Sequence, residues 1–367
     1  MKKIIILIVV VVGMVAGVIL WRTSSIVEKI STNANVLGSL VDALPLKNKN
    51  ILAGEEDDRI NIVLLGMRGR GVEGGGLLTD TIIVVSYIPS RNAMTMVSIP
   101  RDLAINADGE RINKIYYDGE QRKPGGGLAA IKAVLSEVTG QPIHYAVRIN
   151  FAGFAQMIDA VDGISIVRDT PFIEPLQFHE ERVCDGDNGG VFVVPSGHFD
   201  IKRNEKGKIV AKYPKCYNKN EECGGIFKVP AGNVTLNGAQ ALCYARARVT
   251  SSDFDRARRQ HEILYAFQKK ALSVGTLTNF AKLNAFLTAL GDNIQTDMQL
   301  WEMHRFFDFY TEKGFPHVVE QRVLDSSPKG LLYVPKGAGK NGAAYILRPR
   351  GDNYDRIHEM FMKIVAN

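Results

Sequence analysis

Two apolar stretches separated by a short turn most constrain how this chain can fold. Residues 82–88 and 94–99 have strand length and are rich in valine and isoleucine, and Pro89 opens the polar turn between them. If the stretches pair as a hairpin, Asp80 before the first lies beside Arg101 and Asp102 after the second. The sequence therefore predicts a carboxylate and a guanidinium at one sheet end, an arrangement suited to anions and metals.

The rest of the chain alternates between strand and helix patterns, which predicts an α/β fold with a layered sheet. Further strands are expected at residues 60–65, 144–149, 164–167, 318–324 and 330–334. Helices are expected at residues 128–138, 151–161, 238–244, 254–271, 280–290, 300–310 and 354–365. The part after residue 271 is interpreted as the C-terminal part of the same fold.

The N-terminus combines a basic start with a long apolar run. Lys2 and Lys3 precede an unbroken run of apolar residues and glycine over residues 4–21, which is just long enough to span a membrane. A cleaved signal peptide is the competing interpretation, but no convincing cleavage site follows. We expect residues 1–22 to be a transmembrane anchor with a cytoplasmic N-terminus, because the lysines precede the run. Residues 23–57 would be a stalk, and residues 58–367 a domain outside the cytoplasm.

The formal net charge of +6 suits an anionic lipid surface, a polyphosphate or a nucleic acid equally, so charge does not decide the function. The four cysteines narrow the compartment more than the charge does, because disulfides persist outside the cytoplasm. Three of them, Cys184, Cys216 and Cys223, lie within residues 178–232, which are polar and lack a core, and which we interpret as an insertion or long loop. Without a C-x-x-C pair, one disulfide in this loop is favoured over zinc. Cys243, in apolar surroundings, is expected to be a buried thiol.

The hairpin end and several later motifs together resemble the signature of the LytR-CpsA-Psr family, whose members attach glycopolymers to the bacterial cell wall. The later motifs are Leu236-Asn237-Gly238, Tyr244-Ala245-Arg246-Ala247-Arg248, Asp253, Arg256 and Arg259-Gln260. The resemblance covers residues 58–271 most clearly. It implies a layered α-β-α domain with a central mixed β-sheet, preceded by one transmembrane helix.

The resemblance also implies an activity. The chain would be a membrane-anchored phosphotransferase that moves a glycopolymer from a polyprenyl-pyrophosphate carrier to an acceptor hydroxyl of peptidoglycan, with no nucleic-acid partner. Arginines and Mg²⁺ (or Mn²⁺) would hold the pyrophosphate, and a carboxylate, Asp253 or Asp102, would accept the proton of the attacking hydroxyl.

Particular residues acquire roles from this resemblance. The implied catalytic residues are Asp80, Arg101, Asp102 and Asp253. The implied pyrophosphate-binding residues are Arg70, Arg101, Arg246, Arg248 and Arg256. The implied metal ligands are Asp80 and Asp253. Arg246 and Arg248 would point the same way in an extended segment but diverge at a helix end.

One position departs from the family pattern. Arg68 stands where family members usually carry an aspartate, and its charge would favour phosphate but oppose a metal ion. This departure keeps open a non-catalytic protein that binds lipid-linked glycan, and a pyrophosphatase in which water replaces the sugar hydroxyl is also open. A DNA-binding regulator would fit the basic charge, but the predicted anchor argues against it.

Overall fold

The computed structural model describes residues 51–70, 75–185, 192–219, 222–273, 290–314, 316–339 and 343–366. The chain divides into two compact units. Unit 1 consists of Met1–Met157 and Gly275–Asn367, and unit 2 is Ile158–Val274. Within the described ranges no helix is long and apolar enough to cross a membrane. The predicted anchor, most of the predicted stalk and the helix expected at residues 280–290 lie outside those ranges.

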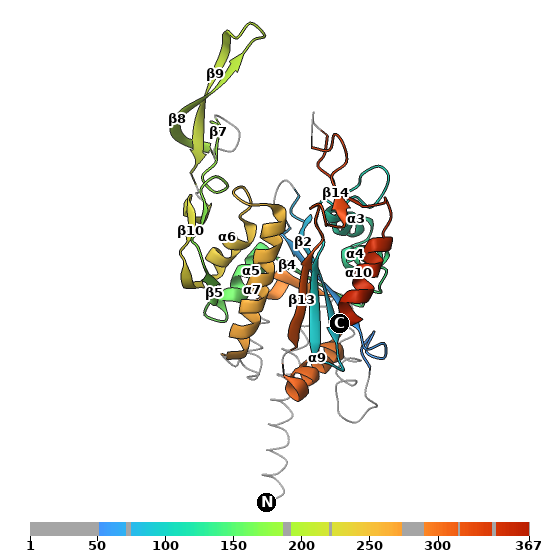
Figure 1. Cartoon of the computed structure of the whole chain (residues 1–367). Coiled ribbons are helices and arrows are strands. Elements are labelled where there is room, and N and C mark those ends of the chain that lie inside the picture. Colours follow the sequence, from blue (N-terminus) through green and yellow to red (C-terminus); the bar gives the residue numbers. More distant parts are fainter. Residues whose placement is uncertain are drawn as a thin grey trace, which may run out of the picture. The chain divides into compact units, whose positions relative to one another are not determined.

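A six-stranded sheet forms the centre of unit 1, in the order β12-β4-β1-β2-β3-β13 (Figure 1). Its strands are β1 (Ile60–Met67), β2 (Thr79–Ile88), β3 (Ala93–Ser98), β4 (Tyr145–Asn150), β12 (Ile294–Thr296) and β13 (His317–Val323). The pairs β1–β4 and β3–β13 are parallel, whereas the other neighbours are antiparallel. The predicted central mixed sheet is therefore confirmed, and the C-terminal strands complete it on both edges.

The predicted hairpin is β2 and β3, which pair from Ile83 opposite Ser98 to Ile88 opposite Ala93. A bulge interrupts the pairing of β2 with β1, because Gly66 lies opposite Thr81 while Met67 lies opposite Thr79. Asp80 is the extra residue of this bulge. Bulges redirect side chains at strand ends, and this one sets the direction of the Asp80 carboxylate.

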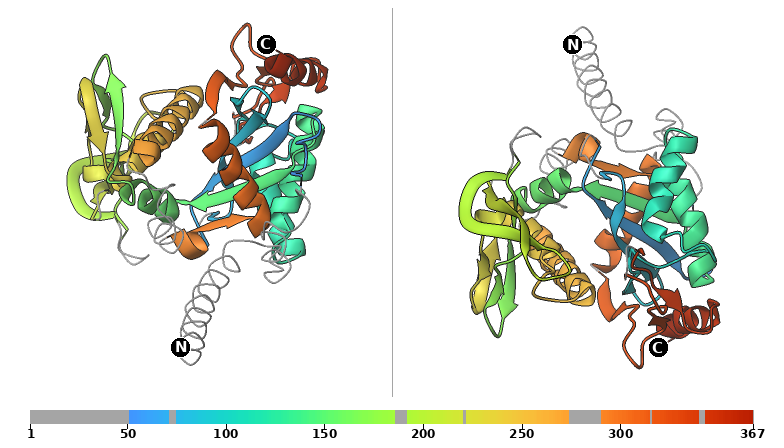
Figure 2. Two further views of the ribbon diagram at one scale, coloured as in Figure 1. Left: turned by 90° about the horizontal axis from the view of Figure 1, so that it is seen from below. Right: turned by 90° about the horizontal axis from the view of Figure 1, so that it is seen from above.

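Helices lie on both faces of the sheet. They are α3 (Ile115–Arg122), α4 (Gly127–Thr139), α9 (Leu300–Lys313) and α10 (Asp355–Ala366), and α5 (Phe151–Asp159) follows β4 directly. One face packs on α9 through a cluster that includes Ile60, Tyr87, Tyr145 and Phe309. Figure 2 shows α3 and α4 on the opposite face. All of these helices except α3 were predicted; the short sequence of α3 contains a glycine and few apolar residues.

The described residues of unit 2 form two small two-stranded sheets, a three-stranded sheet and two α-helices. Strand β5 (Ile164–Arg168) pairs with β11 (Gly232–Leu236), and β6 (Phe172–Glu174) pairs with β10 (Phe227–Val229). The predicted helices are present as α6 (Gly238–Arg246) and α7 (Asp253–Ser273). Asn237 and Gln240 form a capping box that fixes where α6 begins.

Of the two alternatives for residues 178–232, an insertion or a long loop, the long loop was wrong. The segment contains β7 (Glu181–Val183), β8 (Phe192–Arg203) and β9 (Ile209–Asn218), which form a three-stranded sheet in the order β7-β9-β8 (Figure 1). Its strands expose apolar side chains such as Phe199, Ile201 and Ile209. The absence of a core hid the strands from sequence reasoning, since a strand is recognised by one buried face.

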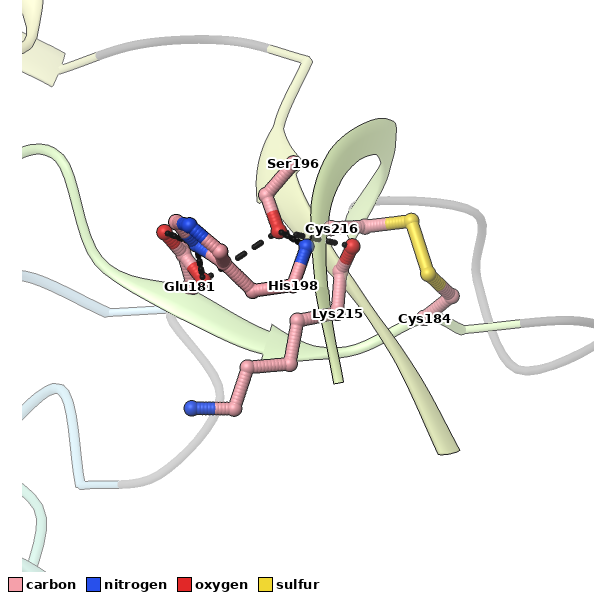
Figure 3. The surroundings of a disulfide bond; sticks show 6 residues. All are labelled: Glu181, Cys184, Ser196, His198, Lys215 and Cys216. Carbon is pink, nitrogen blue, oxygen red and sulfur yellow. Dashed lines mark hydrogen bonds and ion pairs between the residues drawn. A yellow bond between two sulfur atoms is a disulfide. The ribbon is translucent and has the colours of Figure 1, made fainter. Parts of the chain in front are cut away.

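Both pairs of cysteines form disulfides. Cys184 bonds Cys216 within the insertion, as expected of one bridge there (Figure 3). Cys223 bonds Cys243, so the expectation that Cys243 is a buried thiol was wrong. Cys223 has a left-handed backbone conformation (φ 60°) in a tight turn, and this turn brings it to Cys243 on α6. The spacing of cysteines along the sequence does not reveal such a pairing.

Beside the first bridge, Glu181 accepts hydrogen bonds from Ser196 and His198 (Figure 3), and it also accepts one from Tyr217. The hydrogen bond from His198 is the largest cause of the lowered pKa of Glu181. These hydrogen bonds join β7 to both β8 and β9. The disulfide and this polar cluster together stabilise the three-stranded sheet at its β7 strand.

The packing of α9 on the sheet predicts a large cost for truncating Phe309, which is 6% exposed and contacts Tyr87 edge-on at 5.6 Å between ring centroids. We expect Phe309→Ala to lower the free energy of unfolding by about 3–5 kcal/mol. Phe309→Leu keeps most of the volume and should cost less than half as much. Urea unfolding of the purified chain followed by tryptophan fluorescence measures both. Equal stability of Phe309→Ala and the parent would contradict this packing.

A buried histidine in α7 predicts acid sensitivity. Burial lowers the pKa of His261 to about 4, whereas an unfolded histidine titrates near 6.5. The unfolded chain then takes up a proton that the folded chain excludes. Stability should be independent of this group above pH ~6.5 and fall by about 3 kcal/mol as the pH drops to about 4. His261→Leu should flatten the pH dependence of unfolding, while the change of an exposed histidine, His317→Gln, should leave it as it is.

Candidate functional site

The predicted charges at the hairpin end meet in unit 1. Arg101 follows β3 and places one terminal guanidinium nitrogen 2.7 Å from Oδ1 of Asp80. Its Nε lies 3.5 Å from Oδ2 of Asp102. Both side chains of the Asp80–Arg101 pair are partly exposed, at 25% and 22%, so solutes can reach them. The juxtaposition expected from the two apolar stretches is therefore present.

A second arginine extends this group. Asp102 is 5% exposed, and its Oδ1 accepts a hydrogen bond of 3.1 Å from Arg111. The Asp102 backbone is also fixed, because its carbonyl accepts the Leu347 N–H at 2.9 Å. Sequence reasoning missed Arg111, since its segment shows no periodic pattern and lies outside the quoted motifs. The four side chains, hereafter the hairpin-end network, alternate in charge in the order Asp80, Arg101, Asp102, Arg111.

Arg111, the last member of the network, lines a pocket of about 720 Å³ in unit 1. The lining residues are Gly75, Leu78, Asn106, Asp108, Gly109, Glu110, Arg111, Asn113, Lys114 and Tyr117. Arg111 and Lys114 supply cationic donors there, and Tyr117 offers a partly exposed ring. Such a lining can bind phosphate groups through its cations and a sugar through its polar and aromatic groups.

Arg70 has a different carboxylate partner in the structure. Its guanidinium lies 2.6 Å from Oε2 of Glu120, and the Arg70 side chain is 62% exposed. Glu120 is buried and also accepts the Gly127 N–H, which holds it at the start of α4. Arg68, the departure from the family pattern, is exposed. The roles of Arg70 and Arg68 toward pyrophosphate and metal stay predictions.

Three of the predicted residues of unit 2 form a second group. Asp253 is the first residue of α7, and its Oδ1 lies 3.1 Å from Arg256 and 3.8 Å from Arg248. A carboxylate is favourable at a helix N-terminus. The neighbouring Asp255 caps the same helix with Ser252, whose hydroxyl is the largest cause of the lowered pKa of Asp255. Capping explains why Asp255 lies apart from the arginine group.

Arg246 contacts another partner. It is the last residue of α6, and its guanidinium lies 2.7 Å from Oε2 of Glu222 and 5.8 Å from the centroid of the Phe178 ring. Arg248 lies beyond the helix end and contacts Asp253. The two arginines thus have separate partners, as the helix-end alternative predicts, and the extended alternative was wrong.

Two buried charged residues position the loop between α6 and α7. Arg259 is 6% exposed and donates to the carbonyls of Tyr244 and Ala247, so it fixes the backbone on either side of Arg246. Burial lowers the pKa of Arg259. Glu174 is fully buried and accepts the N–H of Val249 at 2.9 Å. Arg259 belongs to a quoted motif, whereas nothing in the sequence distinguished Glu174.

The donor set tests whether the implied metal fits. Among the described residues no group of three His, Cys, Asp or Glu side chains could hold a metal ion. Asp80 and Asp102 do lie on the same guanidinium. Because Mg²⁺ commonly binds one or two carboxylates together with substrate phosphates, these residues fit such an ion when a pyrophosphate is present. The predicted metal and its predicted ligands Asp80 and Asp253 stay predictions.

Comparison with known proteins defines the family. The model of the LytR_cpsA_psr family matches residues 23–335, so the chain belongs to the LytR-CpsA-Psr family. This confirms the family predicted from the motifs.

The curated relatives carry a common name. A polyisoprenyl-teichoic acid–peptidoglycan teichoic acid transferase, TagU, from Oceanobacillus iheyensis is 28% identical over 291 residues, which is 75% of this chain and 73% of the relative. TagU from Bacillus cereus is 27% identical over 276 residues, 71% of this chain and 70% of the relative. These relatives are named as transferases that act on teichoic acid and peptidoglycan.

Solved structures share the fold. TagT bound to LIIa-WTA aligns with a TM-score of 0.53 at 19% identity, over 87% of this chain and 93% of TagT. TagV of Bacillus subtilis aligns with a TM-score of 0.51 at 20% identity, over 83% of this chain and 96% of TagV. The α/β fold with its central mixed sheet is thus that of solved family members.

The buried position of Arg259 predicts that even lysine is a poor replacement. Arg259→Lys loses the planar pair of donors to two carbonyls, and we expect the free energy of unfolding to fall by about 2–3 kcal/mol. Arg258→Lys is the matched control, because Arg258 is 63% exposed and should change stability by less than about 0.5 kcal/mol. Urea unfolding measures both. Similar stability of the two variants would contradict the role given to Arg259.

Proposed function

We propose that the chain is a transferase that moves a glycopolymer from a polyprenyl-pyrophosphate carrier to an acceptor hydroxyl of the cell wall, such as that of peptidoglycan. The observation that carries the proposal is the hairpin-end network, in which two guanidiniums and two carboxylates form a chain of ion pairs that ends in Arg111, a residue of the pocket lining. Membership in the LytR-CpsA-Psr family and the transferase names of the relatives support the same class of reaction.

Arg101 and Arg111 would bind the phosphate oxygens. A guanidinium is planar and permanently charged, and it contacts phosphate through two parallel hydrogen bonds. In the chain alone these charges are balanced by Asp80 and Asp102. The exposed pair Asp80–Arg101 can exchange its partner for a phosphate, whereas the buried Asp102 stays in place.

The carboxylates would divide the remaining work. Each oxygen of Asp102 lies close to a guanidinium nitrogen, so this residue is suited to holding Arg101 and Arg111 rather than to accepting a proton. Asp80 is more exposed and would hold Mg²⁺ together with the pyrophosphate, and the ion would neutralise charge on the phosphates. Arg246, Arg248 and Arg256 in unit 2 are proposed as further anion-binding groups, and Asp253 is proposed as the base that accepts the proton.

The reaction balances without another reactant. The acceptor hydroxyl oxygen forms a bond to the phosphorus next to the glycan, and the bond from that phosphorus to the bridging oxygen breaks. Polyprenyl phosphate leaves with the bonding electron pair, and the hydroxyl proton passes to the carboxylate. The free energy comes from the pyrophosphate, so no nucleotide is needed.

We also propose that residues 1–22 anchor the chain in the cell membrane with the remainder outside the cytoplasm. The apolar run after Lys2 and Lys3 supports this orientation. Two disulfides support it as well, because such bonds are rare in the cytoplasm. An anchored enzyme would meet a lipid-linked donor in the same membrane.

A second candidate function is favoured by Arg68. An exposed arginine where the family usually has an acid favours a non-catalytic protein that binds the lipid-linked glycan. Such a protein would bind the donor and release no product. The pyrophosphatase alternative differs in needing only water as acceptor.

The transfer reaction predicts a sharp dependence on Arg101. The full chain in detergent, given a polyprenyl-pyrophosphate-linked sugar, an acceptor glycan and Mg²⁺, should release polyprenyl phosphate. Arg101→Lys should lower the rate by about 10²-fold, because a fixed donor to the developing charge is lost. Arg91→Lys is the matched control, since this exposed arginine lies at the turn end of the same hairpin and should leave the rate unchanged.

The outcomes separate the candidates. Release that requires the acceptor supports the transferase, whereas release with water alone supports the pyrophosphatase. Donor binding without release supports the binding protein. Release that is insensitive to Arg101→Lys would contradict the role assigned to the hairpin-end network.

A further inference from the structure

The carboxylate of Glu222 forms an ion pair with the guanidinium of Arg246, one of the arginines that we propose to bind phosphate. We propose that Glu222 is a built-in competitor for the anion at Arg246, held there by the Cys223–Cys243 disulfide, and that it selects for polyvalent anions such as pyrophosphate. The inference rests on the proposed function, since it deepens the anion specificity of Arg246.

The covalent geometry brings the two charges together. Cys243 and Arg246 lie one turn apart on α6, so their side chains share a face of that helix. Cys223 bonds Cys243 and directly follows Glu222 in the chain. The disulfide thus carries the Glu222 carboxylate to the Arg246 guanidinium, which it meets at 2.7 Å.

A tight turn fixes the segment that carries Glu222. Cys223 has a left-handed backbone with φ of 60°, and the Gly225 N–H donates to the Glu222 carbonyl at 3.1 Å. Few other non-glycine residues of the described chain adopt a positive φ. The turn therefore holds the Glu222 carboxylate beside the Cys223–Cys243 disulfide, where it contacts Arg246.

Arg246 has the features of an anion-binding group. Its side chain is 22% exposed, and its guanidinium lies against the buried ring of Phe178, while its backbone carbonyl accepts a hydrogen bond from Gln177 at 3.0 Å. These contacts hold the arginine in place. Glu222 is 53% exposed, so an incoming anion can displace it without opening the core.

The tether gives the carboxylate its selectivity. A tethered group has a high effective concentration at its partner, so a weakly charged solute anion competes poorly with it. An anion with several charges gains more from the guanidinium and displaces the carboxylate. Ion pairs this exposed weaken a competing ligand by about two- to fivefold.

Removing the charge of Glu222 tests the proposal. Inorganic pyrophosphate titrated calorimetrically into the full chain in detergent should bind Glu222→Gln about two- to fivefold more tightly than the parent. In an Arg246→Ala background, Glu222→Gln should have no effect. Glu180→Gln is the matched control, because Glu180 is equally exposed at 53% and pairs with Arg182 of the same insertion.

Removing the tether is the second arm. The double variant Cys223→Ser/Cys243→Ser should raise pyrophosphate affinity in the parent but not in Glu222→Gln. If the double variant does not fold, Glu222→Gln and its Arg246→Ala background decide the matter. For each variant, acetate should serve as a singly charged competitor, and its inhibition of pyrophosphate binding should increase when Glu222 loses its charge.

Three results would overturn the proposal. They are no binding of pyrophosphate, an unchanged affinity in Glu222→Gln, or an effect that persists without Arg246. Transfer of glycopolymer is measured separately. Tighter pyrophosphate binding by Glu222→Gln without glycopolymer transfer by the parent chain would support this inference and contradict the proposed function. Transfer by the parent chain without a change in pyrophosphate affinity in Glu222→Gln would support the proposed function and contradict this inference.

Discussion

The ion pair between Asp80 and Arg101 depends on the register of one hairpin. Asp80 and Arg101, which are separated by both strands and the turn between them, meet because β2 and β3 pair residue by residue from Ile83–Ser98 to the turn. Both strands are buried on both faces, and a slip by one residue would exchange the side chains that pack on each face, so the packing fixes that register. The bulge at Asp80 then turns the carboxylate toward the arginine. Core packing thus sets the position of the polar site.

The positive charges of the other candidate arginines are balanced by nearby carboxylates. Arg70, Arg246 and Arg256 each have a carboxylate partner at 2.6, 2.7 and 3.1 Å. An arginine proposed to bind a polyanion needs its charge balanced when no ligand is bound, and an exposed ion pair provides this balance at small cost. In the proposed binding, an arginine exchanges its carboxylate partner for a phosphate group, so no unpaired charge is left buried.

The sequence predicted those strands and helices whose buried apolar residues recur at regular spacing. The valine and isoleucine runs of β2 and the apolar spacing of α4 are local signals, and both elements lie where they were expected. The position of Asp80 beside Arg101 followed from the hairpin alone. Strands β8 and β9 were missed because an exposed sheet has no buried face to leave a pattern.

Other features could not be read from the sequence because they depend on distant contacts. Arg111 becomes part of the site through the buried Asp102, and Glu174 becomes important through backbone groups of another loop. The Cys223–Cys243 bridge joins a turn to a helix, and spacing does not reveal such a pairing. The family motifs marked several of the arginines, but only the structure showed which carboxylate each one contacts.

A crystal structure of the full chain with a polyprenyl-pyrophosphate-linked sugar would test the account most directly. The proposed function predicts pyrophosphate oxygens within hydrogen-bonding distance of the Arg101 guanidinium, with Asp102 still bound to Arg111. A pyrophosphate bound elsewhere, with the Asp80–Arg101 ion pair intact, would contradict it.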